Sequence, residues 1–251
     1  MYRKIDISVY TNQYITYTTP ISPNCKVDLM LNNTVFLEQA IESKSDQAYR
    51  VLEEMIVTME LTPGSLLSES KLVELLGLGR TPVREALQRL ATENLVEIMP
   101  RRGIRITEID IKQQLRLLEV RRSIEELSVR LSARRANHAV KRQFESIADE
   151  MTAAAQAGDY MEFLRLDRDL NELLADAADN EFSARMLQQI HGLSRRFWHK
   201  HYIQVDDLSR VAELHAATAR AIASGEEEAA ASASDSHMDY IQSFTLSTLD
   251  L

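Results

Sequence analysis

The chain of 251 residues is poor in residues that break helices or cross-link them. It has 7 glycines, 5 prolines and one cysteine, Cys25, so few tight turns are expected and no internal disulfide can form. No stretch approaches the roughly 18 consecutive apolar residues of a membrane span. The first residues also lack the apolar run of a secretory signal. These absences predict a largely helical, cytoplasmic protein without a membrane partner.

The sequence motifs of several enzyme classes are absent as well. The chain contains neither a His-Glu-x-x-His helix nor a Gly-x-Ser-x-Gly nucleophile elbow, and it has no glycine-rich loop of the kind that cradles phosphates. We therefore do not expect an enzyme.

The distribution of charge is more informative than the net charge of -9. Residues 80–105 carry six arginines against three glutamates, whereas residues 109–251 carry 17 basic and 24 acidic side chains. Affinity for DNA depends on neutralising phosphates, so a local basic stretch matters even in an acidic chain. The sequence predicts that any nucleic-acid contact lies within residues 80–105.

With 45% hydrophobic residues, the chain can bury a substantial core, and its length favours two domains. Residues 1–42 show no helical period or clean alternation, and we interpret them as an N-terminal extension that is weakly ordered. The alternative is a short strand or an arm over a partner subunit. Residues 43–108 and 109–251 are the predicted domains, and the expected fold class is mainly α.

Residues 43–108 are predicted to form a winged helix-turn-helix domain. A first helix begins near Ser45 and ends before Leu61-Thr62-Pro63-Gly64, because proline and glycine stop helices. Ser68 is placed to cap a second helix. Thr81-Pro82 offers an N-cap followed by proline at the first helical position, which predicts the start of a third helix.

A hairpin is predicted to follow the third helix and to form the wing. Residues 95–98 and 104–106 alternate between apolar and polar side chains, as strands with one buried face do. The connecting segment, Pro100-Arg101-Arg102-Gly103, is cationic. The wing therefore adds positive charge beside the third helix.

The third helix carries two rows of side chains. Residues Arg80, Arg84 and Gln88 are spaced by four and form an exposed row, while a buried stripe follows the helical period: Val83, Ala86, Leu87, Leu90 and Ala91. Arginine can bond a guanine edge in two places, and Thr81 at the helix N-terminus can hold a phosphate. The alternative is a solvated face on an ordinary interaction module, but the basic wing favours DNA binding.

Residues 109–251 are predicted to be an all-α helical bundle. The expected helices, separated by Asn, Asp and Gly breaks, are 110–136, 139–157, 159–177, 181–203, 206–224 and 226–248. Within them Asp167 and Asn171 share one helical face, and His215 and His237 lie on two later helices. A carboxylate, an amide oxygen and two imidazoles could converge on a divalent metal. Spacing alone is weak support, because single histidines are more often ordinary core or surface residues.

Several segments resemble the GntR family of bacterial transcription regulators. The similar segments are Leu61-x-Pro63-Gly64, Glu69, Leu72, Gly79-Arg80-Thr81-Pro82-Val83-Arg84-Glu85-Ala86-Leu87 and Arg102-Gly103. Glu119-x-Arg121-x-x-Ile124-Glu125 resembles the start of an FCD ligand-binding domain, which would place the chain in the FadR branch. The resemblance covers about residues 45–245.

The resemblance implies which residues contact operator DNA. It assigns this role to Arg80, Thr81, Arg84, Arg102 and Gly103, to which the helical spacing adds Gln88. Some members of the family have arginine where Ser70 stands here and Ser or Thr where Gly79 stands. We therefore expect fewer backbone contacts there, or a different operator.

The resemblance also implies a metal and an effector. Many FCD domains bind zinc, nickel or another divalent ion, and Asp167, His215 and His237 match their ligands, with Asn171 in place of a histidine. A neutral oxygen is a poorer zinc ligand than imidazole, which would weaken binding or favour harder ions. A small carboxylate effector is expected to bind beside the metal, contacting Arg121, Arg195 or Arg196. The alternative for Arg121 is an internal salt bridge with a glutamate.

The sequence thus predicts a homodimeric DNA-binding regulator, a repressor, whose affinity for double-stranded operator DNA responds to a small carboxylate. Two alternatives stay open. In one, the bundle is a metalloenzyme in which Asp167, His215 and His237 hold a metal that activates water, and the winged helix is an accessory module. In the other, the protein senses the metal directly and needs no organic effector at Arg121.

Overall fold

The computed structural model describes residues 42–205 and 207–248, without the side chains of 202–205. The predicted extension, residues 1–42, lies outside the described residues except for Glu42. The elements within the described part are α1 (Lys44–Val57), β1 (Leu66–Leu67), α2 (Glu69–Leu76), α3 (Arg80–Thr92), β2 (Val96–Met99), β3 (Gly103–Ile106), α4 (Ile111–Arg135), α5 (His138–Ala157), α6 (Tyr160–Ala178), α7 (Glu181–Val205), α8 (Leu208–Ser224) and α9 (Glu227–Ser247).

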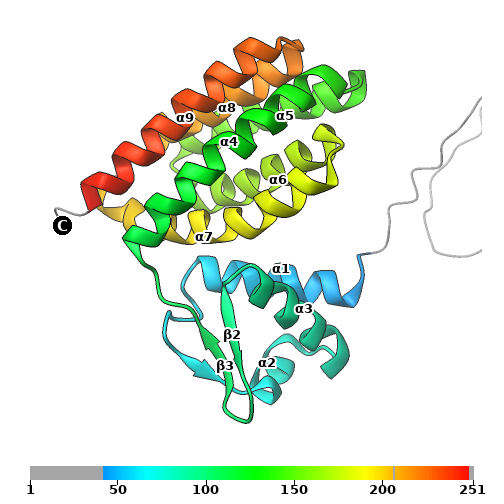
Figure 1. Ribbon diagram of the computed structural model, residues 1–251, viewed down its shortest axis with the longest axis vertical. Helices are drawn as coiled ribbons and strands as arrows, with labels where there is room; N and C mark the ends of the chain where they lie inside the picture. Colours follow the sequence, from blue (N-terminus) through cyan, green and yellow to red (C-terminus); the bar gives the residue numbers. More distant parts are fainter. Residues whose placement is uncertain (1–41, 206, 249–251) are drawn as a thin grey trace, which may run out of the picture. The chain divides into compact units, whose positions relative to one another are not determined.

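The winged helix-turn-helix domain forms as predicted. The Ser43 and Ser68 side chains accept hydrogen bonds from the first turns of α1 and α2, and α2 ends at Gly77 in the left-handed conformation (φ 63°). The buried stripe of α3 packs against α1 and the sheet. Figure 1 shows the β2–β3 hairpin extending beside α2 and α3.

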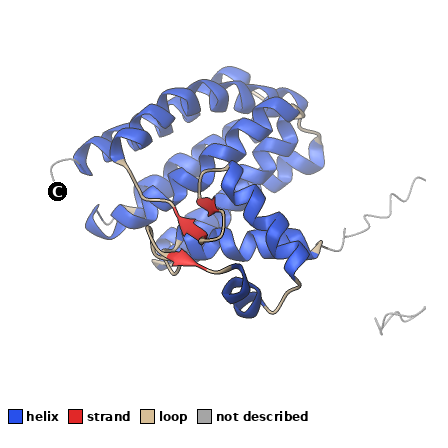
Figure 2. Ribbon diagram, turned by 60° about the horizontal axis from the view of Figure 1, so that its bottom comes forward, coloured by secondary structure: helices blue, strands red, loops and turns tan. Residues whose placement is uncertain are grey.

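Two details of this domain differ from the sequence-based predictions. Helix α3 begins at Arg80, with Gly79 as N-cap and no side-chain cap, so Thr81 lies inside the first turn. The wing also has a third strand, β1, which pairs antiparallel with β3 and gives the order β1-β3-β2. Figure 2 shows these three short strands in red. Two residues carry too little alternation to be recognised as a strand from sequence.

Helices α4 to α9 form the predicted bundle, and every predicted boundary lies within two residues of the observed one. Polar residues set several of these boundaries: Asp110 and Asn137 accept hydrogen bonds from the first turns of α4 and α5. The core of the bundle is built from α4, α5, α6 and α8 around Phe144, Met151 and Phe163. The fold class is therefore mainly α, with a winged helix followed by a helical bundle.

Candidate functional site

The exposed row of α3 is placed as the sequence predicts. Arg80, Thr81, Arg84 and Gln88 are all exposed, whereas the alternate stripe of the same helix is buried. Arg84 is 62% exposed at its side chain and forms an ion pair with Glu69 of α2 at 2.8 Å. That hydrogen bond raises the pKa of Arg84, so its charge is secure. One row packs, and the other is open to a partner.

The wing places two more arginines in solvent. Arg101 and Arg102 are exposed at the turn between β2 and β3, which is closed by a hydrogen bond from the Arg102 N–H to the Met99 carbonyl at 3.0 Å. Arg101 has a φ of 64°, in the left-handed region that favours glycine. Gly103 has a φ of 118°, and a Cβ there would collide with the Leu67 carbonyl oxygen. The glycine predicted to contact DNA is thus also needed for the β1–β3 pairing.

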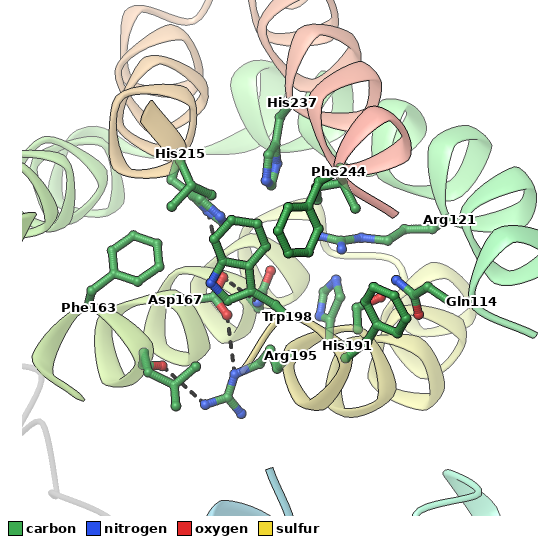
Figure 3. Close-up of a pocket in the computed structure, with 16 residues that line it drawn as sticks. Gln114, Arg121, Phe163, Asp167, His191, Arg195, Trp198, His215, His237 and Phe244 are labelled. Carbon is green, nitrogen blue, oxygen red and sulfur yellow. Dashed lines mark hydrogen bonds and ion pairs between the residues drawn. The ribbon is translucent and has the colours of Figure 1, made fainter. Parts of the chain in front are cut away.

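A cavity in the bundle brings together the residues predicted to bind metal. Asp167 enters it from α6, His215 from α8 and His237 from α9 (Figure 3). Asn171 of α6 lines it as well. His215 Nδ1 lies 3.6 Å from Asp167 Oδ1, and the two histidine rings have their centroids 4.1 Å apart. Four helix positions spread over 71 residues, from Asp167 to His237, therefore line the same cavity.

The donor atoms do not form a coordination shell in this arrangement. Among the described residues, no three His, Cys, Asp or Glu side chains are placed to hold one metal ion. The Asn171 amide donates to Asp167 Oδ1 at 3.2 Å, and Arg195 Nε lies 3.2 Å from Asp167 Oδ2. The His237 Nε2 atom is buried and has no hydrogen-bond partner. The side chains are of the right kind, but Asp167 is already neutralised by an arginine, and the metal stays a prediction.

The histidines of the cavity are neutral. Burial lowers the pKa of His215 and His237 below their ordinary value, and Asp167 opposes this only at His215. A third histidine, His191 of α7, lines the same cavity, and burial together with the nearby Arg121 lowers its pKa strongly. Its Nε2 atom has no hydrogen-bond partner. The cavity therefore presents uncharged imidazole nitrogens.

Sequence reasoning did not identify His191. Its four-residue spacing from Arg195 and seven-residue spacing from Trp198 place all three on one face of α7, and all three line the cavity. This spacing is the sequence feature that could have indicated His191 as a cavity residue. The ring-bearing residues Trp198, His199 and His201 also lie on α7. Trp198 does line the cavity, while His199 bonds Tyr160 Oη at 3.1 Å and His201 packs on Phe197.

The three predicted effector-binding arginines have different surroundings. Arg121 lines the cavity, but its Nε donates to Glu125 Oε2 at 2.6 Å, so the internal salt bridge is what the structure contains. Arg195 lines the cavity and is bound to Glu53 Oε1 at 2.5 Å. Both guanidinium groups are buried and already paired.

Of the two alternatives, Arg195 and Arg196, only Arg195 lines the cavity. Arg196 lies outside it and donates to the Thr107 carbonyl at 2.9 Å and to the Glu108 carbonyl at 3.3 Å. Successive residues of a helix point about 100° apart, so Arg195 and Arg196 cannot share a target. Burial lowers the pKa of Arg196 to about 10, which leaves it charged. It binds the segment between β3 and α4.

Within the described residues, none of the helices is long and apolar enough to cross a lipid bilayer.

Comparisons with known proteins match both halves of the chain. The model of the bacterial regulatory proteins of the gntR family matches residues 44–106, and the FCD domain model matches residues 116–240. The solved structure of E. coli McbR/YncC aligns with a TM-score of 0.71 at 20% identity, covering 82% of this chain and 99% of that one. A putative GntR regulator from Rhodococcus sp. RHA1 aligns with a TM-score of 0.61 at 20% identity, over 81% of this chain and 98% of that one. These likenesses show a shared fold.

Relatives identified by sequence carry the names of regulators. The Nta operon transcriptional regulator of Aminobacter aminovorans is 31% identical over 166 residues, 64% of this chain and 76% of the relative. The transcriptional repressor RspR of Escherichia coli K12 is 30% identical over 54% of this chain and 59% of its own length. YdhC of Bacillus subtilis is 28% identical over 59% of this chain and 66% of its own length, so the matches span less than two thirds of these two relatives. The chain belongs to the GntR family of bacterial regulatory proteins and carries an FCD domain after its helix-turn-helix domain.

Proposed function

We propose that the protein is a homodimeric, cytoplasmic transcription repressor of the FadR branch, whose affinity for operator DNA is controlled by a small carboxylate bound in the bundle. The observation that carries this proposal is the exposed row of α3. Arg80, Arg84 and Gln88 project from a helix whose opposite face is fully packed, beside a wing with two exposed arginines. The name of the relative RspR supports repression as the sign of regulation.

The geometry of α3 suits a major groove. The N-terminal residues of a recognition helix read base edges, and Arg80, Thr81 and Arg84 occupy that end of α3. Arg84 is held by Glu69 in the free protein and can exchange this carboxylate for a guanine edge or a phosphate. Two copies related by a twofold axis would address two half-sites, with the bundle setting their separation.

The cavity suits a small anion. It combines Arg121 and Arg195 with the unpartnered Nε2 atom of His191, which can donate a hydrogen bond to a carboxylate oxygen. Because Glu125 and Asp167 already neutralise the two arginines, an effector carboxylate must compete with a protein carboxylate. Binding therefore changes ion pairs inside the bundle, which is a route to a population shift between dimer geometries.

We also propose a divalent metal, zinc or nickel, at Asp167, Asn171, His215 and His237. The donor types and the unpartnered His237 Nε2 support it, while the contacts of Arg195 and Asn171 with Asp167 oppose it. Elemental analysis of the purified protein, with the His215→Ala/His237→Ala variant as control, tests this point. A stoichiometric metal that the variant lacks supports it, and a metal-free wild type overturns it. Metal-dependent DNA affinity without any metabolite would instead indicate a direct metal sensor.

The DNA-binding proposal is tested by fluorescence anisotropy with the DNA upstream of the protein's own gene. We expect binding that is preferred over a scrambled duplex of equal length at moderate salt and that is lost in the Arg80→Ala/Arg84→Ala variant. The matched control is Arg165→Ala, which removes an exposed arginine of the bundle. Equal binding of both duplexes, or equal loss in the control, would overturn the proposal.

A further inference from the structure

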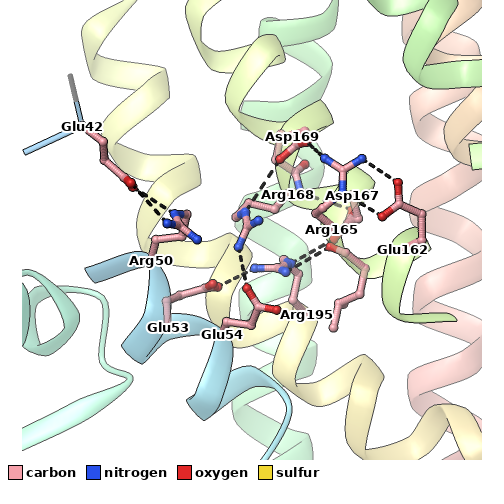
Figure 4. A network of polar contacts seen from close by, with 12 residues as sticks. Glu42, Arg50, Glu53, Glu54, Glu162, Arg165, Asp167, Arg168, Asp169 and Arg195 are labelled. Atoms are coloured by element: carbon pink, nitrogen blue, oxygen red, sulfur yellow. Dashed lines mark hydrogen bonds and ion pairs between the residues drawn. The ribbon is translucent and has the colours of Figure 1, made fainter. Parts of the chain in front are cut away.

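Arg195 of α7 is shared by two carboxylates from different domains. Its Nη1 donates to Glu53 Oε1 of α1 at 2.5 Å, and its Nε lies 3.2 Å from Asp167 Oδ2 of α6, which lines the cavity (Figure 4). Its Nη2 donates to the Leu164 carbonyl at 3.1 Å. One guanidinium therefore joins the winged helix to the floor of the cavity.

All three groups are removed from water. Glu53 is 4% exposed, and Arg195 and Asp167 are each 7% exposed. Burial alone would lower the pKa of Arg195, but Glu53 and Asp167 outweigh it and the pKa is raised, so the cation persists. Electrostatic interactions are strong and poorly screened in such surroundings. One positive charge facing two carboxylates makes the strength of either contact depend on the other.

Gly192 lets α1 pack closely against α7 beside Arg195. Gly192 lies one turn before Arg195, and a Cβ there would lie 2.8 Å from Leu95 Cδ1 and 3.6 Å from Glu53 Oε1. The missing side chain lets α1 and the Leu95 segment pack directly on the helix that lines the cavity. The contact at Arg195 is thus part of a close junction between α1 and α7.

From this arrangement we infer that Glu53, a residue of the DNA-binding domain, is a positioning residue of the effector cavity that acts through Arg195. A change in the charge of the cavity should then change how firmly α1 packs on α7, and a change at α1 should alter the cavity. A role of this contact in regulation rests on the proposed function. The coupling between the Glu53–Arg195 and Asp167–Arg195 ion pairs can nevertheless be measured without DNA or effector.

A neighbouring ion pair provides the control. Arg168 of α6 binds Glu54 of α1 at 3.1 Å and also joins the two domains, but Glu54 is 44% exposed and Arg168 does not line the bundle cavity. Glu53→Gln and Glu54→Gln remove the same charge from adjacent positions of α1. Only Glu53 bonds Arg195 directly, so only Glu53→Gln should alter the surroundings of the cavity.

The test is a double-mutant cycle between Asp167→Asn and Glu53→Gln on the full chain, read by hydrogen exchange of the α1 amides. Asp167→Asn removes one competitor for Arg195, so exchange in α1 should slow by about fivefold. The effect should vanish in the Glu53→Gln background, persist with Glu54→Gln and be largely retained with Glu53→Asp. An equal effect with Glu53→Gln, or no effect in the wild-type background, overturns the inference.

A second readout covers the case in which Asp167→Asn does not fold. Trp198 is the single tryptophan of the chain and lines the cavity, so its emission reports on that site. Glu53→Gln should shift the emission and change acrylamide quenching, and Glu54→Gln should not; equal spectra overturn the inference. Operator titrations of the same variants separate the two proposals. Absent DNA binding with intact linkage would refute the proposed function alone.

Discussion

The arginines of the proposed DNA-facing surface, at the start of α3 and in the wing, and the buried arginines of α7 have opposite surroundings. Among the described residues, Arg80, Arg101 and Arg102 form no ion pair, and they are exposed. Arg195 and Arg196 are buried, and each is fixed by at least two protein groups. A charge left in solvent contributes little to folding and is available to a partner, whereas a buried charge is costly to leave unpaired. Arginine is therefore available to a partner in one region and is tied to protein groups in the other.

The largest effect on stability is expected at the junction. Arg195→Met leaves Glu53 and Asp167 as buried carboxylates without their cation, which should lower the free energy of unfolding by roughly 3 to 5 kcal/mol. Urea denaturation at fixed protein concentration measures the change. Arg168→Met, at the neighbouring and more exposed pair, should cost about 1 kcal/mol or less. Equal losses would remove the distinction between the two kinds of ion pair.

The second-largest effect is a pH dependence of the free energy of unfolding, which is caused by Glu93, a buried acid of the winged helix. Burial raises the pKa of Glu93 to about 7, although the Tyr49 hydroxyl and Arg89 oppose the shift. The folded state thus holds the proton more tightly than the unfolded chain does, so this contribution to stability is complete below about pH 4.5 and is lost as the pH rises through about 7.

The expected size of this effect is roughly 3 kcal/mol between pH 5 and pH 8. Glu93→Gln should remove it, so the variant gains stability relative to the wild type as the pH rises. Thermal or urea unfolding at both pH values measures the difference. Glu97→Gln, at an exposed position of β2, should not alter the profile in this way. A parallel profile for wild type and Glu93→Gln would contradict the prediction.

At the DNA-facing surface the effect should appear in binding and not in folding. Arg80→Ala should lower affinity for the preferred duplex by roughly 1 to 3 kcal/mol, because it removes one arginine contact to a base edge. The free energy of unfolding should change by about 0.5 kcal/mol or less, since Arg80 is exposed. Anisotropy titrations and urea denaturation of the same preparation separate the two quantities. A large loss of stability would place Arg80 with the structural arginines instead.

The same contrast explains what could be predicted from the sequence. The helices and the exposed row of α3 follow from periodicity and local caps such as Asp110 and Asn137, which act within a few residues. The short strand β1 depends on pairing with β3, which is distant in sequence. No local pattern indicates that Arg195 pairs with Glu53, 142 positions away.

The cavity shows the same limit. Spacing is weak ground for grouping Asp167, His215 and His237, and the resemblance to a family is what strengthens it. His191 shares a face of α7 with Arg195, but the sequence does not state that this face lines the cavity. The rotation of α7 decides that Arg195 faces the cavity and Arg196 the segment after β3. The direction in which a helical side chain points depends on how the helix packs against its neighbours. That packing cannot be read from a single sequence.

The smallest effect is expected at Arg101, at the tip of the wing. One substitution there should change DNA affinity and the free energy of unfolding in opposite directions. Arg101 has a φ of 64°, a conformation that costs roughly 1 to 2 kcal/mol for most side chains and little for glycine. Arg101→Gly should therefore raise the free energy of unfolding by about 1 kcal/mol or less, because glycine also gains freedom in the unfolded chain. It should weaken DNA binding and reduce its salt dependence by about one phosphate contact. Arg101→Asn, which tolerates this φ, is the control for backbone strain. If both variants bound DNA as the wild type does, the strained arginine would have no role in recognition, and the contrast between the two regions would hold for α3 but not for the wing.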